Sequence, residues 1–261
     1  MARPRSTART VLALLLLAIV AAVCLSLGRW QLQRAAERDV RRSTFEKGQQ
    51  LPPITLKPNT GNDYHPWQTA RAEGEWLQEL TVLLMNRNYK GFPGYWVITP
   101  LLLSNSNNTA VLVLRGWLPQ QKPPQDPRPK VPANTGLVQI NGALLKEIPR
   151  LYELPSLFRE RTETPLLDDW KQDELPVRQN LAIADFAQAS QLTLLPTILQ
   201  QAPSANISTP FVRDWDTPRI DSATNRGYAL QWFGFSAIAL LAIAFISWKQ
   251  WLRPRLGFKQ Q

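Results

Sequence analysis

The chain has 261 residues, a formal net charge of +10, one cysteine and one histidine. One Cys and one His exclude an intrachain disulfide, a Cys/His zinc site, a Cys-based copper relay and the C-x-x-C-H attachment of c-type haem. The excess positive charge lies near the two ends, because residues 51–248 hold 17 basic and 17 acidic side chains. This distribution argues against nucleic-acid binding and indicates topological signals and contacts with lipid headgroups.

Residues 10–28 form an uncharged run of 19 residues between two arginines, which predicts a first transmembrane helix. A basic start followed by "VLALLLLAIV" is also typical of a signal peptide cleaved after Gly28, and this alternative stays open. Cys24 lies inside the run. Val23 precedes it, which disfavours a lipoprotein anchor, so we interpret Cys24 as a small buried apolar residue.

The segment after the first span predicts a helix that leaves the bilayer and then a series of strands. Residues 29–48 have few β-branched residues and no Pro, which favours a polar helical extension. Short runs rich in Val, Leu, Ile, Thr and aromatic residues then alternate with Gly, Asn and Pro clusters, which predicts successive antiparallel strands. These runs are residues 67–76, 79–88, 95–103, 110–119 and 136–145.

Residues 119–136 hold six Pro and predict an extended surface loop that joins two strands. Residues 183–191, with Asp185 near the start, predict a short helix, and residues 194–201 predict a last strand.

Residues 227–248 form a second uncharged run, 22 residues long. As a helix this run would be about 33 Å long, close to the thickness of a bilayer's hydrocarbon core. The sequence therefore predicts an α+β membrane protein, in which two terminal transmembrane helices enclose one largely antiparallel β extramembrane domain, residues 29–226.

The orientation follows from the basic tail, residues 249–261, which carries four Lys or Arg and no acid. We expect this tail and residues 1–9 in the cytoplasm and the domain in the periplasm. Nine residues before the first span leave no room for a mitochondrial transit peptide, so we expect a bacterial inner membrane.

The chemistry-bearing residues do not predict an enzyme. His65 has Asp63 two residues away, but no G-x-S-x-G nucleophile elbow, glycine-rich phosphate loop or defensible carboxylate pair is present. We interpret His65 as a loop residue and expect no catalytic residue and no metal site.

Four motifs resemble the Surfeit locus protein 1 family in order and spacing: "LGRWQLQRAAER", "GYWVITPLL", "VLVLRGWLP" and "GYALQWFGF". The resemblance implies a membrane assembly factor for haem-copper cytochrome c oxidases. It also implies partners among the oxidase subunits and the haem a synthesis or assembly proteins. Bacterial members have been proposed to bind haem a and to help deliver it to the catalytic subunit, which makes haem a a transient cofactor here.

The second span departs from the family at one position. Many members carry a His three residues before the Tyr of "GYALQWFGF", as the proposed axial ligand of haem a, and here that position is Asn225. Asparagine is a poor ligand for haem iron. Asn225 and Tyr228, with Trp232 one turn further, are expected on one helical face.

Two interpretations of this helix mouth stay open. In the first, the porphyrin packs on aromatic side chains while an arginine meets its propionates; the aromatic candidates are Tyr228, Trp232, Phe233 and Trp30, and the arginines are Arg226 and Arg29. In the second, the aromatics form interfacial belts and the arginines extend to the headgroups.

The "RGW" stretch, Arg115 to Trp117, ends an apolar strand. Gly116 permits a bulge or a close approach, so we favour a structural role for it. Arg115 must find a carboxylate, backbone carbonyls or water, or a partner's acidic group, while Trp117 can stack on it.

Three hypotheses remain, in this order. The first is an oxidase assembly factor that handles haem a or stabilises its insertion. The second is a haem-free membrane chaperone or tether for oxidase subunits. The third is an extracytoplasmic sensor or hydrolase with two anchors.

Overall fold

The structure is a computed structural model that describes residues 5–59, 63–122, 124–133, 135–152, 166–171, 175–203, 209–216, 218 and 220–252. The chain divides into two compact units. The first unit, Met1–Ser43 with Pro218–Gln261, holds most of the two long helices, and the second, Thr44–Thr217, holds the β-rich domain.

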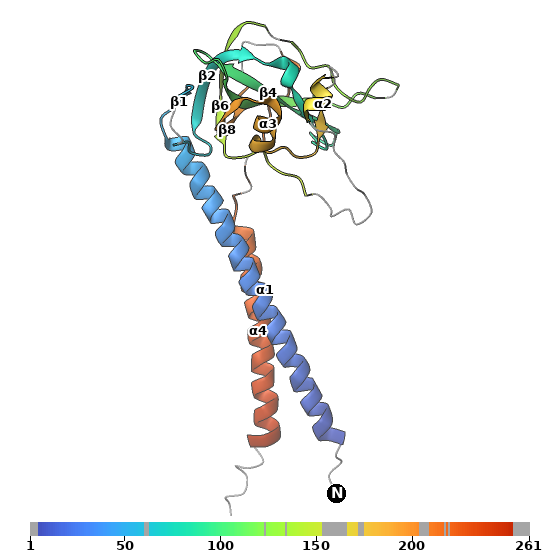
Figure 1. Cartoon of the computed structure of the whole chain (residues 1–261). Helices are drawn as coiled ribbons and strands as arrows, with labels where there is room; N and C mark the ends of the chain where they lie inside the picture. Colours follow the sequence, from blue (N-terminus) through green and yellow to red (C-terminus); the bar gives the residue numbers. More distant parts are fainter. Residues whose placement is uncertain are drawn as a thin grey trace, which may run out of the picture. The chain divides into compact units, whose positions relative to one another are not determined.

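The long helices are α1 (Arg5–Gln50) and α4 (Ala223–Ser247), and a π-helical turn (Trp248–Leu252) follows α4. α1 continues without a break from the apolar run through the polar residues 29–48, because no proline lies between Pro4 and Pro52. The two helices run beside one another in Figure 1.

The apolar side chains of both helices are mostly exposed, since only 17% of each apolar window is buried inside the protein. In water such a surface would be strongly unfavourable, whereas a bilayer solvates it. Both helices are long and apolar enough to cross a membrane. The large exposed side chains include Leu12, Leu15, Leu16, Ile19, Val23, Ile238, Leu240, Leu241 and Phe245.

Among the described residues, eight strands form one sheet in the order β1-β2-β6-β8-β5-β4-β3-β7. Their bounds are β1 (Ile54–Leu56), β2 (Thr69–Trp76), β3 (Val82–Leu84), β4 (Gly94–Leu103), β5 (Thr109–Pro119), β6 (Leu137–Leu145), β7 (Val177–Arg178) and β8 (Thr193–Gln201). An additional pairing of β2 with β4 closes the ring β2-β6-β8-β5-β4. Figure 1 shows these strands wrapped around one another.

The largely antiparallel sheet expected from the sequence is confirmed, and β3 with β4 and β4 with β5 are antiparallel pairs of successive strands. β2 does not pair with β3, and β5 does not pair with β6. β8 lies between β5 and β6, parallel to the first and antiparallel to the second. The long proline-rich connection between β5 and β6 does not impose a hairpin, so the last strand can insert between them.

Parallel pairs also join β1 to β2 and β3 to β7. The sequence did not predict β1 or β7, which have three and two residues.

The apolar pattern of the strands follows their position in the sheet. β2 alternates between exposed and buried residues, the pattern of a strand with one face in the core. β5 is buried from Ala110 to Leu118, because both of its faces are covered. Val111 and Val113 pack into one core cluster, and Leu112 and Leu114 pack into another.

Two short helices complete the second cluster, α2 (Leu166–Lys171) and α3 (Ile183–Ser190). Phe186 of α3 is fully buried there and meets Trp170 of α2 edge to face, with ring centroids 5.3 Å apart. The short helix expected at residues 183–191 is therefore confirmed.

Candidate functional site

Small side chains line the contact between α1 and α4. Ser236 Oγ donates a hydrogen bond to the Ala21 carbonyl at 3.0 Å. A Cβ added to Gly28 would lie 2.5 Å from the Phe233 ring, so a larger residue there would require that ring to shift. The buried small residues of the two helices include Ala21, Cys24, Ala35, Ala229, Ser236 and Ala239. Spacings of three and four residues between small side chains are typical of closely packed membrane helices.

Polar groups join the same helices beyond the small residues. Asp39 accepts hydrogen bonds from Ser222 Oγ and Arg226 Nη2, both at 2.6 Å. Arg38 Nη1 donates to the Asp221 carbonyl at 2.7 Å. The hydrogen bond from Ser222, assisted by Arg226, holds the pKa of the Asp39 carboxyl below its usual value. Arg226, one of the two arginines expected to meet haem propionates, is thus paired within the protein.

Asn225 takes part in this helix pairing. Its Nδ2 donates a hydrogen bond to Gln31 Oε1 at 2.7 Å, and its Oδ1 is buried with no partner. The side-chain atom left over is an amide oxygen, which is a poor ligand for haem iron compared with imidazole, thiolate or thioether. Asn225 does not fit the role of an axial haem ligand.

The predicted aromatic residues differ in their exposure and in their ring contacts. Tyr228 and Trp30 expose 51% and 50% of their surface, and Arg34 lies 5.6 Å from the centroid of the Trp30 ring. Trp232 packs edge to face on Phe235, with centroids 6.0 Å apart. Among the ring contacts of the described residues, none joins Trp30, Tyr228 and Trp232. The exposed rings of Tyr228 and Trp30 fit stacking against a flat apolar group.

The "RGW" stretch is a β-bulge in β5. Val97 pairs with Gly116 and the next residue, Ile98, pairs with Leu114, so Arg115 is the extra residue. Gly116 has φ +149°, and a Cβ there would lie 2.7 Å from Phe211 Cβ. The expected structural role of Gly116 therefore has two physical causes, a backbone angle that favours glycine and the close approach of Phe211.

The bulge places Arg115 and Trp117 beside two different cavities. Arg115 is only 1% exposed, and its guanidinium carbon lies 4.5 Å from the Trp76 ring centroid and 4.8 Å from that of Phe211. Its Nη2 donates to the Pro132 carbonyl at 3.4 Å. Burial, together with the charge of Arg213, lowers the pKa of Arg115 to about 10, so the side chain stays protonated at neutral pH.

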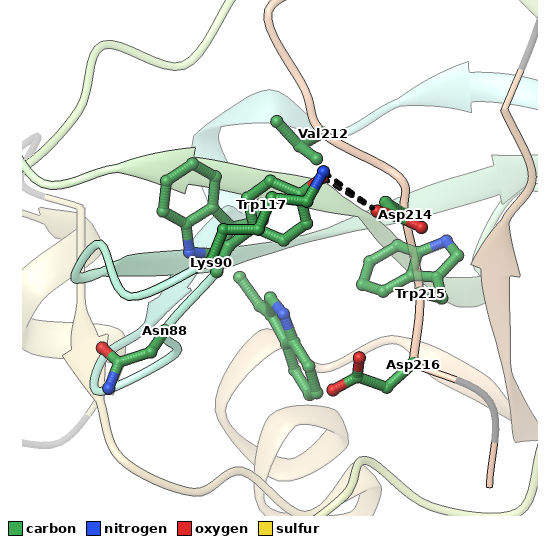
Figure 2. Close-up of a pocket in the computed structure, with 9 residues that line it drawn as sticks. Asn88, Lys90, Trp117, Val212, Asp214, Trp215 and Asp216 are labelled. Carbon is green, nitrogen blue, oxygen red and sulfur yellow. Dashed lines mark hydrogen bonds and ion pairs between the residues drawn. The ribbon is translucent and has the colours of Figure 1, made fainter.

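Trp117 lines an aromatic cavity of about 220 Å³ (Figure 2). Its indole nitrogen donates to the Arg87 carbonyl at 2.6 Å, which fixes the ring. At the cavity Asp214 accepts a hydrogen bond from the Tyr89 hydroxyl at 2.9 Å and forms an ion pair with Lys90 at 3.8 Å. These contacts pair the Lys90 and Asp214 charges with one another. The remaining lining residues are Asn88, Trp96, Val212, Trp215 and Asp216.

Neither the lone histidine nor the lone cysteine lines either cavity. His65 Nε2 is 4.0 Å from Asp63 Oδ1, and both side chains are exposed. Cys24 is buried in the helix pair. Within the part of the chain that the structure describes, no three His, Cys, Asp or Glu side chains come together as a metal site.

Sequence reasoning missed four residues that surround Arg115: Trp76, Gln201, Phe211 and Arg213. The stretch "FVRDWD", residues 211–216, mixes aromatic or apolar side chains with charged ones, and this pattern is the one sequence signal that could have indicated a site there. Nothing in the sequence, however, connects that stretch to β5, which it reaches through two backbone hydrogen bonds between Val212 and Trp117.

A comparison with curated proteins gives no match. The sequence matches the SURF1 family over residues 18–237, which run from within the first apolar helix, through the β-rich domain, into the second. This match confirms the resemblance carried by the four motifs. The chain therefore belongs to the SURF1 family, whose members are cytochrome oxidase assembly factors.

Proposed function

We propose that the protein is an assembly factor for a haem-copper cytochrome c oxidase and that it assists the delivery of haem a to the catalytic subunit or its stabilisation there. The family match, which runs from within α1 through the β-rich domain into α4, carries this proposal. The proposed location is a bacterial inner membrane, with both termini in the cytoplasm and the β-rich domain in the periplasm. The basic tail and the lipid-compatible surface of the helices support it.

The helix mouth supports a contact with haem that does not use an iron bond from Asn225. The amide nitrogen of Asn225 donates a hydrogen bond to Gln31, so this side chain serves the contact between the two helices. Tyr228 and Trp30 each leave about half of their surface open, as a flat amphipathic ring needs. The proposed contact is therefore aromatic packing beside the helix pair, with Arg29 rather than Arg226 left to meet a propionate, because Arg226 pairs with Asp39.

A second candidate function is a haem-free tether or chaperone for oxidase subunits. The observation that favours it is that three residues of the predicted haem face serve helix pairing instead. Asn225 binds Gln31, Arg226 binds Asp39, and Phe233 fills the space over Gly28. Under this function, the exposed apolar surface of α1 and α4 contacts transmembrane helices of the oxidase.

An absorption spectrum separates the two functions. The protein would be purified in detergent after coexpression with haem a synthesis enzymes, and its haem content measured against protein. The first function predicts retained haem a, weaker retention in Tyr228→Ala, which removes one of the two half-exposed rings, and little spectral change in Asn225→Ala. Asn225→His should tighten binding and shift the spectrum toward histidine-ligated low-spin haem.

The matched control is Phe245→Ala, which removes an exposed aromatic ring from the far part of α4 and should leave haem retention unchanged. If neither the native protein nor Asn225→His retains haem a, the result contradicts haem delivery and supports the haem-free tether or chaperone.

The assembly role itself is tested by the amount of mature oxidase in membranes. Arg115→Ala should lower the oxidase while the protein remains in the membrane, since Arg115 is expected to serve a partner contact or the local strand corner. A normal oxidase level in that variant would contradict a functional part for Arg115.

A further inference from the structure

Arg115 and Arg213 line a second cavity, of about 150 Å³, in the β-rich domain. We propose that this cavity binds a carboxylate group, supplied either by a small free anion or by an acidic side chain of a partner polypeptide. The proposal concerns the β-rich domain alone and does not depend on haem binding. The other lining residues are Trp76, Val138, Gln139, Ile140, Gln201 and Thr209.

The cavity carries positive charge from two arginines. Arg213 Nε donates a hydrogen bond to the Arg115 carbonyl at 2.7 Å, so two arginine side chains meet at one cavity. Burial lowers the pKa of both, yet Arg115 remains protonated at neutral pH. None of the ion pairs among the described residues supplies a carboxylate to either arginine. Two adjacent cations, one of them fully buried, require a counter-charge.

Several buried polar atoms at the cavity have no hydrogen-bond partner. Seven buried side-chain atoms in the described part of the chain lack a hydrogen-bond partner, and three of them belong to residues that line this cavity. Arg115 Nη1 and Trp76 Nε1 are donors, and both residues are more than nine-tenths buried. Gln201 Oε1 is an acceptor, which can hold a bridging water. Native proteins rarely leave so many buried groups unpaired in one place.

The shape of the cavity favours a carboxylate over a larger anion. The Trp76 and Phe211 rings lie beside the Arg115 guanidinium, so a ligand must approach its edge. A planar carboxylate accepts hydrogen bonds in the plane of a guanidinium, which is the preferred geometry of this pair. Val138 and Ile140 supply an apolar wall for the methylene groups that would carry the carboxylate.

The alternative is a purely structural arginine, neutralised well enough by two aromatic faces and the Pro132 carbonyl. That alternative predicts no ligand that discriminates between a carboxylate and its neutral amide. The test therefore compares N-acetylglutamate amide with N-acetylglutamine amide, which has nearly the same shape without the charge.

The full-length protein in detergent would be titrated by calorimetry with the two amides, acetate and inorganic phosphate. We expect binding of N-acetylglutamate amide and at least tenfold weaker binding of the glutamine analogue. Arg213→Gln should weaken carboxylate binding at least tenfold. Arg71→Gln, which removes one positive charge from an exposed position on β2, should leave it unchanged.

A second variant tests the same proposal if Arg213→Gln fails to fold. Thr209→Glu places a carboxylate on the lining of the cavity, where it should pair with the arginines, raise the unfolding temperature and abolish binding of the added carboxylate. Thr209→Gln is its neutral control and should keep binding.

The source of the carboxylate follows from the comparison with acetate. Equal affinities support a small free anion, and N-acetylglutamate amide binding at least tenfold tighter than acetate supports an acidic side chain. Equal binding of the two amides, equal losses in Arg213→Gln and Arg71→Gln, or tighter binding of phosphate than of carboxylate would overturn the proposal.

Discussion

Replacing Gly116 by alanine tests whether the bulge in β5 determines the stability of the β-rich domain. The φ of +149° disfavours any side chain, which costs about 1–3 kcal/mol. The new Cβ would lie 2.7 Å from Phe211 Cβ, a backbone-anchored atom that cannot rotate away, and such overpacking costs a further ~1–3 kcal/mol. We therefore expect Gly116→Ala to lower the free energy of unfolding by about 4 kcal/mol.

For a domain the size of Thr44–Thr217, each kcal/mol lowers the melting temperature by about 2–4 °C, so Gly116→Ala should melt about 8–16 °C lower. The measurement is thermal unfolding followed by near-ultraviolet circular dichroism of the tryptophans. Gly91→Ala is the matched control, because Gly91 has φ +85° and no atom within 4 Å of the added Cβ. It should lose only the backbone part, about 1–2 kcal/mol. Equal melting temperatures for the two variants would refute the steric argument.

Three further predictions concern the helices and their orientation. In a background without the native cysteine, Ala21→Cys and Ser236→Cys should form a disulfide on mild oxidation, because these two residues are in contact. The cross-link is detected as a change of gel mobility without reductant, and its absence would mean that the helices pack in a different register. The hydrogen-bonded Asp39 carboxyl has a lowered pKa, so its stabilisation is present above its unfolded pKa of about 4 and is lost as the pH falls through the lower folded value. Asp39→Asn should therefore flatten the fall of the melting temperature between pH 5 and 3, and an unchanged slope would contradict the pairing. A reporter active only in the cytoplasm should work after Gln261 and fail within residues 119–136, and the opposite pattern would invert the orientation.

Local patterns sufficed for the position of most strands and failed for their partners. The alternation in β2 and the apolar run of β5 are properties of neighbouring residues, so both strands were predicted close to their observed bounds. Which strands pair depends on contacts between distant segments. No local sequence pattern predicts that β8 lies between β5 and β6. β1 and β7 are too short to show a strand pattern in the sequence.

The sequence predicted that Gly116 would lie at a bulge or a close approach, because a glycine at the end of an apolar strand is typical of both. The residues around Arg115 were not predicted, since Arg213 is 98 positions away in the sequence.

The sequence also did not predict which face of α4 turns toward α1. Apolar side chains surround that helix, so the residues that face α1 cannot be separated from those that face lipid. The structure places Asn225 and Ala229 toward α1, while Tyr228 stays exposed, and the contact of this region with haem stays a prediction.

The insertion of β8 between β5 and β6 also determines when the domain becomes complete during synthesis. β5 and β6 emerge first, each with an edge that only β8 covers. Translation from Leu145 to Gln201 takes about 3–11 s at roughly 5–20 residues per second, and for that time both edges can pair with other nascent chains. α4 begins soon after β8, at Ala223, so the ring closes only shortly before the second long helix is made. A chain that stops after α3 would therefore retain one anchor and two unpaired strand edges, which favours aggregation at the membrane over a merely inactive product.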